Sequence, residues 1–203
     1  MKPILSLVCA LAASVLLAAS LNANAGVYLA FDDGPSNSNS PNLVNALKSK
    51  GAKATFFCIG NKISANMTGF NAIKNAGYSI QNHSYTHSHM LTWTYSQVYN
   101  DIKQCQDAVK NAGGGTPRYF RPPYLEQNTN IKNACAALGL TIITDTVDSQ
   151  DWNGATVSQI IANCNKLQNN GILLAHNWPA NTVTAMPTVV QNLNNRGLST
   201  SQY

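Results

Sequence analysis

The sequence has few charged residues. Of its 203 residues, only 10% are Asp, Glu, Lys or Arg, while 44% are apolar. The apolar share is ordinary for a globular protein, but the charged share is well below the usual quarter. This composition excludes a highly charged disordered chain. It also argues against a cytosolic coiled coil, which would need many Glu and Lys residues. The length allows one large domain or two small ones with a sizeable core.

Runs of basic residues and phosphate-binding loops are also missing. The formal net charge is +5, but the Lys and Arg residues are scattered and form no stripe that could follow a phosphate backbone. We therefore expect no nucleic-acid partner. A mild positive charge would still favour acidic polymers such as decorated plant cell wall. No Gly-rich phosphate loop follows the first predicted strand, which disfavours dinucleotide and nucleoside triphosphate chemistry.

No two cysteines have the CxxC spacing, so a zinc–thiolate site is not expected. Beyond the N-terminal segment the cysteines are Cys58, Cys105, Cys135 and Cys164. In an exported chain, this even number is compatible with up to two disulfides in any of three pairings. The alternative is four buried free thiols that act as small apolar residues. The sequence leaves both alternatives open.

Residues 1–25 have the pattern of a cleaved signal peptide. Lys2 supplies a short basic region, residues 4–18 are almost wholly apolar, and Ala-Asn-Ala at 23–25 has the form of a cleavage site. The apolar run is short for a membrane span, and no second run of spanning length follows. We therefore expect a secreted, extracellular protein with no membrane attachment after cleavage, and one domain over residues 26–203.

Short β-prone runs alternate with helical patterns along the rest of the chain. Strands are predicted at residues 26–31, 54–59, 78–81, 118–120, 140–144, 171–175 and 198–202. Helices are predicted at residues 41–50, 67–76, 96–112, 130–138, 156–168 and 186–195. This alternation implies parallel βα units. The predicted fold class is therefore α/β, a single-domain distorted (β/α) barrel with about seven parallel strands. An open doubly wound sheet is the alternative.

Polar residues cluster where the predicted strands end. Three of the four histidines and five of the eight acidic residues lie in five segments that directly follow strands. In a parallel barrel these strand ends share one face, where βα loops build active sites. The segments are residues 32–35 (DDGP), 82–87 (NHSYTH), 121–124 (RPPY), 145–152 (DTVDSQDW) and 176–179 (HNWP).

His83 and His87 are candidate metal ligands. They are four residues apart, so a helical turn would place both imidazoles on one side. With one carboxylate they would form a three-ligand set that leaves room for water and substrate, which suits a catalytic zinc or another divalent metal such as cobalt. The spacing alone is weakly specific, because surface histidines are common. His89 is expected to point away from this pair.

Asp32 and Asp33 are adjacent carboxylates, of which one could bind metal while the other acts as a base. Asp-Asp-Gly-Pro is also a common turn. A glycosidase carboxylate pair is the rival interpretation, but adjacent residues rarely flank a sugar bond from both sides. Arg121 could orient a carboxylate or form a surface salt bridge. Trp152 and Trp178 could face a sugar or belong to the core.

Taken together, these segments resemble the polysaccharide deacetylases of carbohydrate esterase family four, the NodB-homology group. Five motifs of that family occur in order: FDDGP at 31–35, HSYTH at 83–87, RPPY at 121–124, DSQDW at 148–152 and LAH at 174–176. The flanking stretches GGGTPRYFRPPY, VDSQDWN and HNWPANT are most similar to secreted bacterial acetylxylan esterases. Similar motifs occur in enzymes that deacetylate chitin oligosaccharides. The resemblance implies that residues 26–203 form a polysaccharide deacetylase catalytic domain.

The resemblance also implies a role for each matched residue. Asp33, His83 and His87 match the ligands of one divalent metal ion, Zn²⁺ or Co²⁺. Asp32 matches the catalytic base and His176 the general acid.

The remaining matched residues support those groups. Arg121 matches the residue that holds the base, and Asp151 the partner of the acid histidine. The backbone N–H of Tyr124 matches the oxyanion donor, and the side chains that match the walls of the acetyl pocket are Trp152 and Leu174. In one departure, Leu125 replaces the glycine that usually follows RPPY, so we expect a different loop shape there.

The implied activity is metal-dependent removal of acetyl groups from a polysaccharide by activated water. The favoured substrate is O-acetylated xylan, because of the motif flanks and the small domain. Chitin oligosaccharides and peptidoglycan are the alternatives, because they present an acetyl group to the same machinery. A catalytically inactive carbohydrate-binding protein is the alternative of another class. We expect a monomer.

Overall fold

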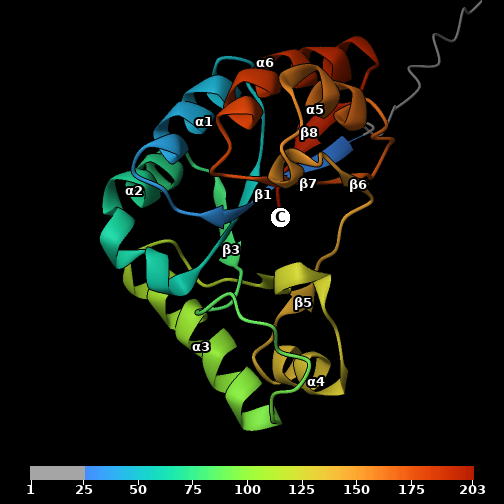
Figure 1. The fold of residues 1–203 in the computed structure, drawn as a ribbon. Coiled ribbons are helices and arrows are strands. Elements are labelled where there is room, and N and C mark those ends of the chain that lie inside the picture. The colour runs from blue at the N-terminus through green and yellow to red at the C-terminus, as the bar shows by residue number, and fades with distance from the viewer. Residues whose placement is uncertain (1–25) are drawn as a thin grey trace, which may run out of the picture.

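Eight strands form one curled parallel sheet in the computed structural model, which describes residues 26–203 (Figure 1). The main path runs β5-β4-β3-β2-β1-β7-β6, and β8 pairs with the first residues of β1. The strands are β1 (Gly26–Gly34), β2 (Thr55–Cys58), β3 (Ser79–Asn82), β4 (Tyr119–Phe120), β5 (Thr141–Ile142), β6 (Val147–Asp148), β7 (Ile172–His176) and β8 (Ser199–Ser201). The seven strands of the main path confirm the predicted distorted (β/α) barrel. The predicted signal peptide lies outside the described residues.

The six predicted helices are all present. They are α1 (Asn39–Lys48), α2 (Met67–Asn75), α3 (Tyr95–Asn111), α4 (Thr129–Ala137), α5 (Val157–Cys164) and α6 (Ala180–Asn195). Four short 3₁₀ turns that the sequence did not predict are η1 (Gly60–Lys62), η2 (Ser64–Asn66), η3 (Pro123–Leu125) and η4 (Asp151–Asn153). Within residues 26–203, no helix is both long enough and apolar enough to pass through a bilayer.

The sequence missed one strand and placed the start of one helix too late, each for an identifiable reason. Strand β6 was missed because it is two residues long, too short to show a periodic pattern. Helix α6 begins at Ala180 rather than at residue 186. The added first turns include Thr182, which is fully buried and donates a hydrogen bond to Asp151, so a contact distant in sequence extends this helix.

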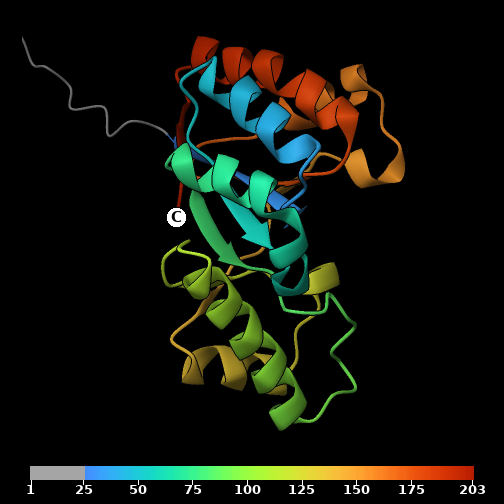
Figure 2. The same ribbon diagram turned by 90° about the vertical axis from the view of Figure 1, so that its left-hand side faces the viewer.

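Two apolar clusters hold the helices against the sheet. The larger contains Leu29 and Phe31 of β1 with inward residues of α1, α2, α5 and α6. The smaller joins α3, α4 and β4 around Ile102 and Phe120. Figure 2 shows α1 and α6 side by side on one side of the sheet, with α3 and α4 packed together at the other end.

Cys58, Cys105, Cys135 and Cys164 are all buried free thiols. Of the two alternatives, the disulfide framework is therefore wrong for the described residues. Three of these cysteines belong to the larger apolar cluster and Cys135 to the smaller. Burial raises the pKa of Cys105, Cys135 and Cys164 to about 12, so these thiols are unreactive packing residues.

Candidate active site

The five polar segments meet in one pocket at the carboxyl ends of the strands. The pocket has a volume of about 410 Å³. Its lining residues are Asp32, Asp33, His83, His87, Pro122, Tyr124, Leu125, Asp148, Trp152, Leu174, His176 and Trp178. Eight of the ten predicted site residues thus line one pocket. The other two, Arg121 and Asp151, lie buried behind it, where each bonds a lining residue.

Asp32 and Asp33 face the same pocket because the end of β1 is irregular. Along a regular strand, adjacent side chains point to opposite faces. Here the pairing with β2 changes register between Phe31 and Gly34, and Asp33 has a left-handed backbone with φ of 68°. Such a bulge re-aims a side chain, so both carboxylates reach the site.

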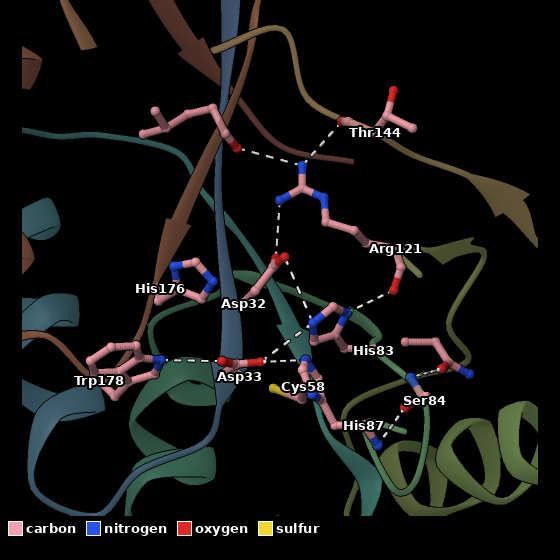
Figure 3. A network of polar contacts seen from close by, with 12 residues as sticks. Asp32, Asp33, Cys58, His83, Ser84, His87, Arg121, Thr144, His176 and Trp178 are labelled. Carbon is pink, nitrogen blue, oxygen red and sulfur yellow. Dashed lines mark hydrogen bonds and ion pairs between the residues drawn. The ribbon is translucent and has the colours of Figure 1, made fainter. Parts of the chain in front are cut away.

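Three side chains converge as a group of metal-type ligands (Figure 3). The Nε2 atoms of His83 and His87 lie 3.4 Å and 3.1 Å from Oδ1 of Asp33. His83 Nδ1 lies 2.7 Å from the carbonyl oxygen of Arg121. A carbonyl only accepts hydrogen bonds, so Nδ1 carries a proton, and Nε2 is the ring nitrogen that faces Asp33.

This group fits a divalent cation. Oδ1 of Asp33 is buried and has no hydrogen-bond partner among the described residues. Burial by itself would raise the pKa of Asp33, but the two neighbouring imidazoles hold it well below its usual range. Two imidazole nitrogens and one carboxylate oxygen make a ligand set for zinc or cobalt that leaves further positions open. A histidine fixed through its other nitrogen is typical of such ligands.

The two histidines lie on a loop, so the predicted helical turn is wrong. Ser84 and His87 have positive φ angles of 63° and 57°, which no α-helix contains. The loop winds around the carboxylate of Asp101 in α3, which accepts the N–H groups of Tyr85 and Thr86 at 2.7 and 3.1 Å. The Ser84 hydroxyl accepts the N–H of His87 at 2.8 Å.

Asp101 is therefore a site-building residue that the sequence analysis missed. It is 95% buried, with 5% of its surface exposed. It follows Val98 by three residues and precedes Cys105 by four, so it lies on the apolar face of α3. A carboxylate on the buried face of a helix needs hydrogen-bond donors. That signal was present in the sequence.

Arg121 is buried and holds Asp32. Its Nη1 lies 3.0 Å from Asp32 Oδ1, and the side chains are 0% and 3% exposed. Its Nη2 donates to the carbonyl of Thr144 at 3.2 Å, and the guanidinium lies 4.7 Å from the centre of the Phe57 ring. The alternative of a surface salt bridge is thus wrong. Asp32 Oδ2 lies on the other side, 3.8 Å from His83 Nε2.

His176 lines the same pocket as the metal-type group and is paired with Asp151. Its Nδ1 lies 2.7 Å from Asp151 Oδ1, and its backbone N–H donates to Oδ2 at 2.7 Å. The Thr182 hydroxyl donates to the same Oδ2 at 2.6 Å. Burial would lower the pKa of His176, but the hydrogen bond and charge of Asp151 raise it above its ordinary value. The imidazolium is therefore favoured.

Tyr124 and Leu125 form a tight turn at the pocket edge. Both have left-handed backbones, with φ of 55° and 58°. Leu125 thus has the left-handed conformation that glycine adopts most easily, and its side chain lines the pocket. The expected difference in loop shape from the family stays a prediction. The N–H of Tyr124 donates to no acceptor among residues 26–203. His89 stays outside the metal-type group and stacks on the Tyr124 ring at 3.8 Å.

Trp152 and Trp178 are not core residues. They are 50% and 45% exposed, and both line the pocket. The indole N–H of Trp152 donates to Asp148 Oδ2 at 3.1 Å, and that of Trp178 donates to Asp33 Oδ2 at 3.1 Å. The predicted acetyl-pocket walls, Trp152 and Leu174, lie in the same pocket.

A barrel that carries a carboxylate and an imidazolium beside three metal-type ligands is suited to hydrolysis. Comparison with known proteins narrows this class to one family. Residues 22–143 match the family model described as polysaccharide deacetylase. The chain therefore belongs to the polysaccharide deacetylase family, which confirms the resemblance seen in its motifs.

Individual relatives support the same assignment. The chain is 42% identical over 179 residues to a bifunctional xylanase/xylan deacetylase of Cellvibrio japonicus, a match that covers 87% of this chain and 27% of that protein. It is 31% identical over 178 residues to the peptidoglycan-N-acetylglucosamine deacetylase PgdA of Listeria monocytogenes, covering 86% and 37%. The matched region is thus 27% of one of these curated relatives and 37% of the other.

A solved structure is similar over nearly its whole length. The family 4 carbohydrate esterase from Streptomyces lividans, determined in complex with acetate, has a TM-score of 0.85 and 42% sequence identity. The superposition covers 88% of this chain and 93% of that one. The described fold is therefore that of family 4 carbohydrate esterases.

Proposed function

We propose that this protein is a secreted, metal-dependent deacetylase that removes acetyl groups from a polysaccharide, and that its substrate is O-acetylated xylan. The observation that carries the proposal is the convergence of Asp33 Oδ1 with the Nε2 atoms of His83 and His87. This group lies in the same pocket as Asp32 and His176. Asp33, His83 and His87 would hold one Zn²⁺ or Co²⁺ ion, which when bound would polarise the acetyl carbonyl.

Asp32 is the proposed base. Its carboxylate is held by Arg121 at 3.0 Å, so one oxygen is fixed and the other faces the metal-type group. From this position Asp32 takes a proton from the attacking water. The fixed geometry lowers the cost of orienting the base in the transition state.

One residue stabilises the developing negative charge, and another protonates the leaving group. The N–H of Tyr124 donates to the oxyanion, which is the usual task of a preorganised backbone donor at such a site. His176 gives its proton to the leaving sugar oxygen. Asp151 keeps the imidazole protonated and fixes its orientation. The products are acetate and a deacetylated glycan.

Xylan is favoured by the 42% identity to a protein named as a xylanase/xylan deacetylase. The alternative is N-deacetylation of peptidoglycan, which the similarity to the Listeria enzyme supports at 31% identity. Chitin oligosaccharides are a further alternative from the motif pattern. An amide substrate would use the same residues, with His176 protonating an amine. Secretion is supported by the signal-peptide pattern of residues 1–25.

Acetate release tests the proposal. Purified protein loaded with Zn²⁺ or Co²⁺ is incubated with acetylated xylan, N-acetyl chitopentaose and peptidoglycan, with and without a chelator. We expect chelator-sensitive acetate release, with xylan as the best substrate. His87→Ala should lose both metal binding and activity. Release from peptidoglycan or chitopentaose alone would overturn the xylan assignment. Sugar binding without acetate release from any polymer would instead support the inactive binding protein.

A further inference from the structure

The two oxygens of Asp33 have different partners. Oδ1 faces His83 and His87 and has no hydrogen-bond partner, whereas Oδ2 accepts the indole N–H of Trp178 at 3.1 Å (Figure 3). A carboxylate with both oxygens free can rotate and bind a cation through either or both. The indole hydrogen bond occupies Oδ2 and presents Oδ1 alone to the histidines.

The loop that carries Trp178 is itself held in place. The side-chain amide of Asn39 in α1 donates to the carbonyl of Trp178 at 2.6 Å. The neighbouring Asn177 is buried; its backbone N–H donates to the carbonyl of Asp32 at 2.9 Å and its side chain to Ser40 at 2.6 Å. The backbone is thus held by hydrogen bonds at the N–H of Asn177 and at the carbonyl of Trp178.

Packing does not explain the position of Trp178. The residue is 45% exposed, so ordering its large side chain buries less apolar surface than a core tryptophan would. Its partner inside the pocket is the carboxylate of Asp33, and its ring centre lies 5.8 Å from that of His176. The polar bond to a candidate metal ligand is the specific contact that the ring makes.

We propose that Trp178 is a positioning residue that orients Asp33 for metal binding through Oδ1 alone. This inference rests on the proposed metal site. A hydrogen bond from a neighbour fixes the orientation of a ligating group, and its loss typically costs about 10–100-fold in metal affinity. Because one oxygen is withheld, more coordination positions are left for water and the acetyl oxygen. Trp178 therefore tunes both the affinity and the coordination number of the site.

Trp178→Phe tests this role, because it keeps an aromatic ring and removes the N–H. Metal-free protein is titrated with Zn²⁺ by calorimetry, and the absorption spectrum of the Co²⁺ form reports coordination. We expect the dissociation constant for Zn²⁺ to rise about 10-fold or more and the Co²⁺ spectrum to change. Trp152→Phe is the matched control, because Trp152 is similarly exposed and its indole N–H also donates to a carboxylate, that of Asp148, which lies outside the metal-type group. It should leave both readouts unchanged.

The outcomes separate this inference from the proposed function. If the wild-type protein binds neither metal, the proposed metal site fails and the inference fails with it. If the wild type binds Zn²⁺ and Trp178→Phe binds it equally well with the same Co²⁺ spectrum, only the inference is overturned. Should Trp178→Phe not fold, Asn39→Ala is the second variant, because it loosens the Trp178 loop from a distance. It should weaken Zn²⁺ binding, and unchanged binding would overturn the inference.

Discussion

At the scale of single residues, Asp32 and Asp33 are chemically identical neighbours that differ only in their surroundings. Asp32 is paired with the fully buried Arg121, whereas Asp33 lies between two imidazoles and an indole N–H. The first arrangement fixes a carboxylate in a position to accept a proton, and the second presents one oxygen to a cation. In the proposed function, the surroundings of the two carboxylates assign their two roles, as is common for paired carboxylates.

Loss of the buried Asp32–Arg121 pair should lower the stability of the protein. Arg121→Met leaves the Asp32 charge buried without its partner, and removing one member of a buried pair typically costs about 3–5 kcal/mol. We expect the free energy of unfolding, measured in urea, to fall by about this amount. In the double variant with Asp32→Asn much of the loss should be recovered. Equal stability of the single and double variants would contradict this account.

Asp151 should control the pH dependence of the activity through the pKa of His176. It raises the pKa of His176, so the imidazolium required of the proposed general acid persists to higher pH. We expect the activity to fall as the pH rises through that raised pKa. Asp151→Asn removes the carboxylate charge and lowers the pKa of His176. We therefore expect the basic limb of the kcat profile for acetate release to move to lower pH. A limb that stays at the wild-type position would exclude His176 as the titrating acid.

At the scale of elements, the site depends on helix α3 although α3 contributes no residue to the pocket. Asp101 accepts the backbone N–H groups of Tyr85 and Thr86 and the hydroxyl of Thr86 at 2.7 Å. These bonds hold the loop between His83 and His87 in a shape with positive φ angles that it would not adopt alone. The helix therefore sets the distance between the two histidines.

Asp101→Asn should accordingly weaken metal binding without touching a metal ligand. An amide has one acceptor oxygen where the carboxylate has two, so at least one of the three loop bonds is lost. We expect a higher dissociation constant for Zn²⁺ and a lower melting temperature. Asp107→Asn on the same helix is the control, because Asp107 forms an exposed pair with Lys103, and such pairs contribute little. Equal effects of both variants would count against the loop role of Asp101.

At the scale of the whole molecule, stability comes from two apolar clusters without any disulfide among residues 26–203. The four buried cysteines are part of these clusters. A barrel of this size buries enough apolar surface to fold without covalent links. The proposed export to an oxidising compartment would permit disulfides without requiring them.

The free thiols can be counted chemically. When the protein is unfolded without reductant and alkylated, we expect the peptides that contain Cys58, Cys105, Cys135 and Cys164 each to carry the label in mass spectrometry. In the folded protein labelling should be slow, because burial raises the pKa of these thiols. Reductant should leave the melting temperature unchanged. Any of these peptides found unlabelled after unfolding would indicate a disulfide.

The sequence by itself determined the alternation of strands and helices and the five polar segments that follow strands, because periodicity and turn residues are local signals. It therefore predicted the barrel and eight of the residues that line the pocket. It could not predict that the histidines lie on a loop wound around Asp101, or that the Trp178 indole bonds Asp33. Trp178 and Asp33 are 145 positions apart in the sequence. Such contacts form only when distant segments pack together. The tertiary structure therefore decided the orientation of each predicted side chain in the site.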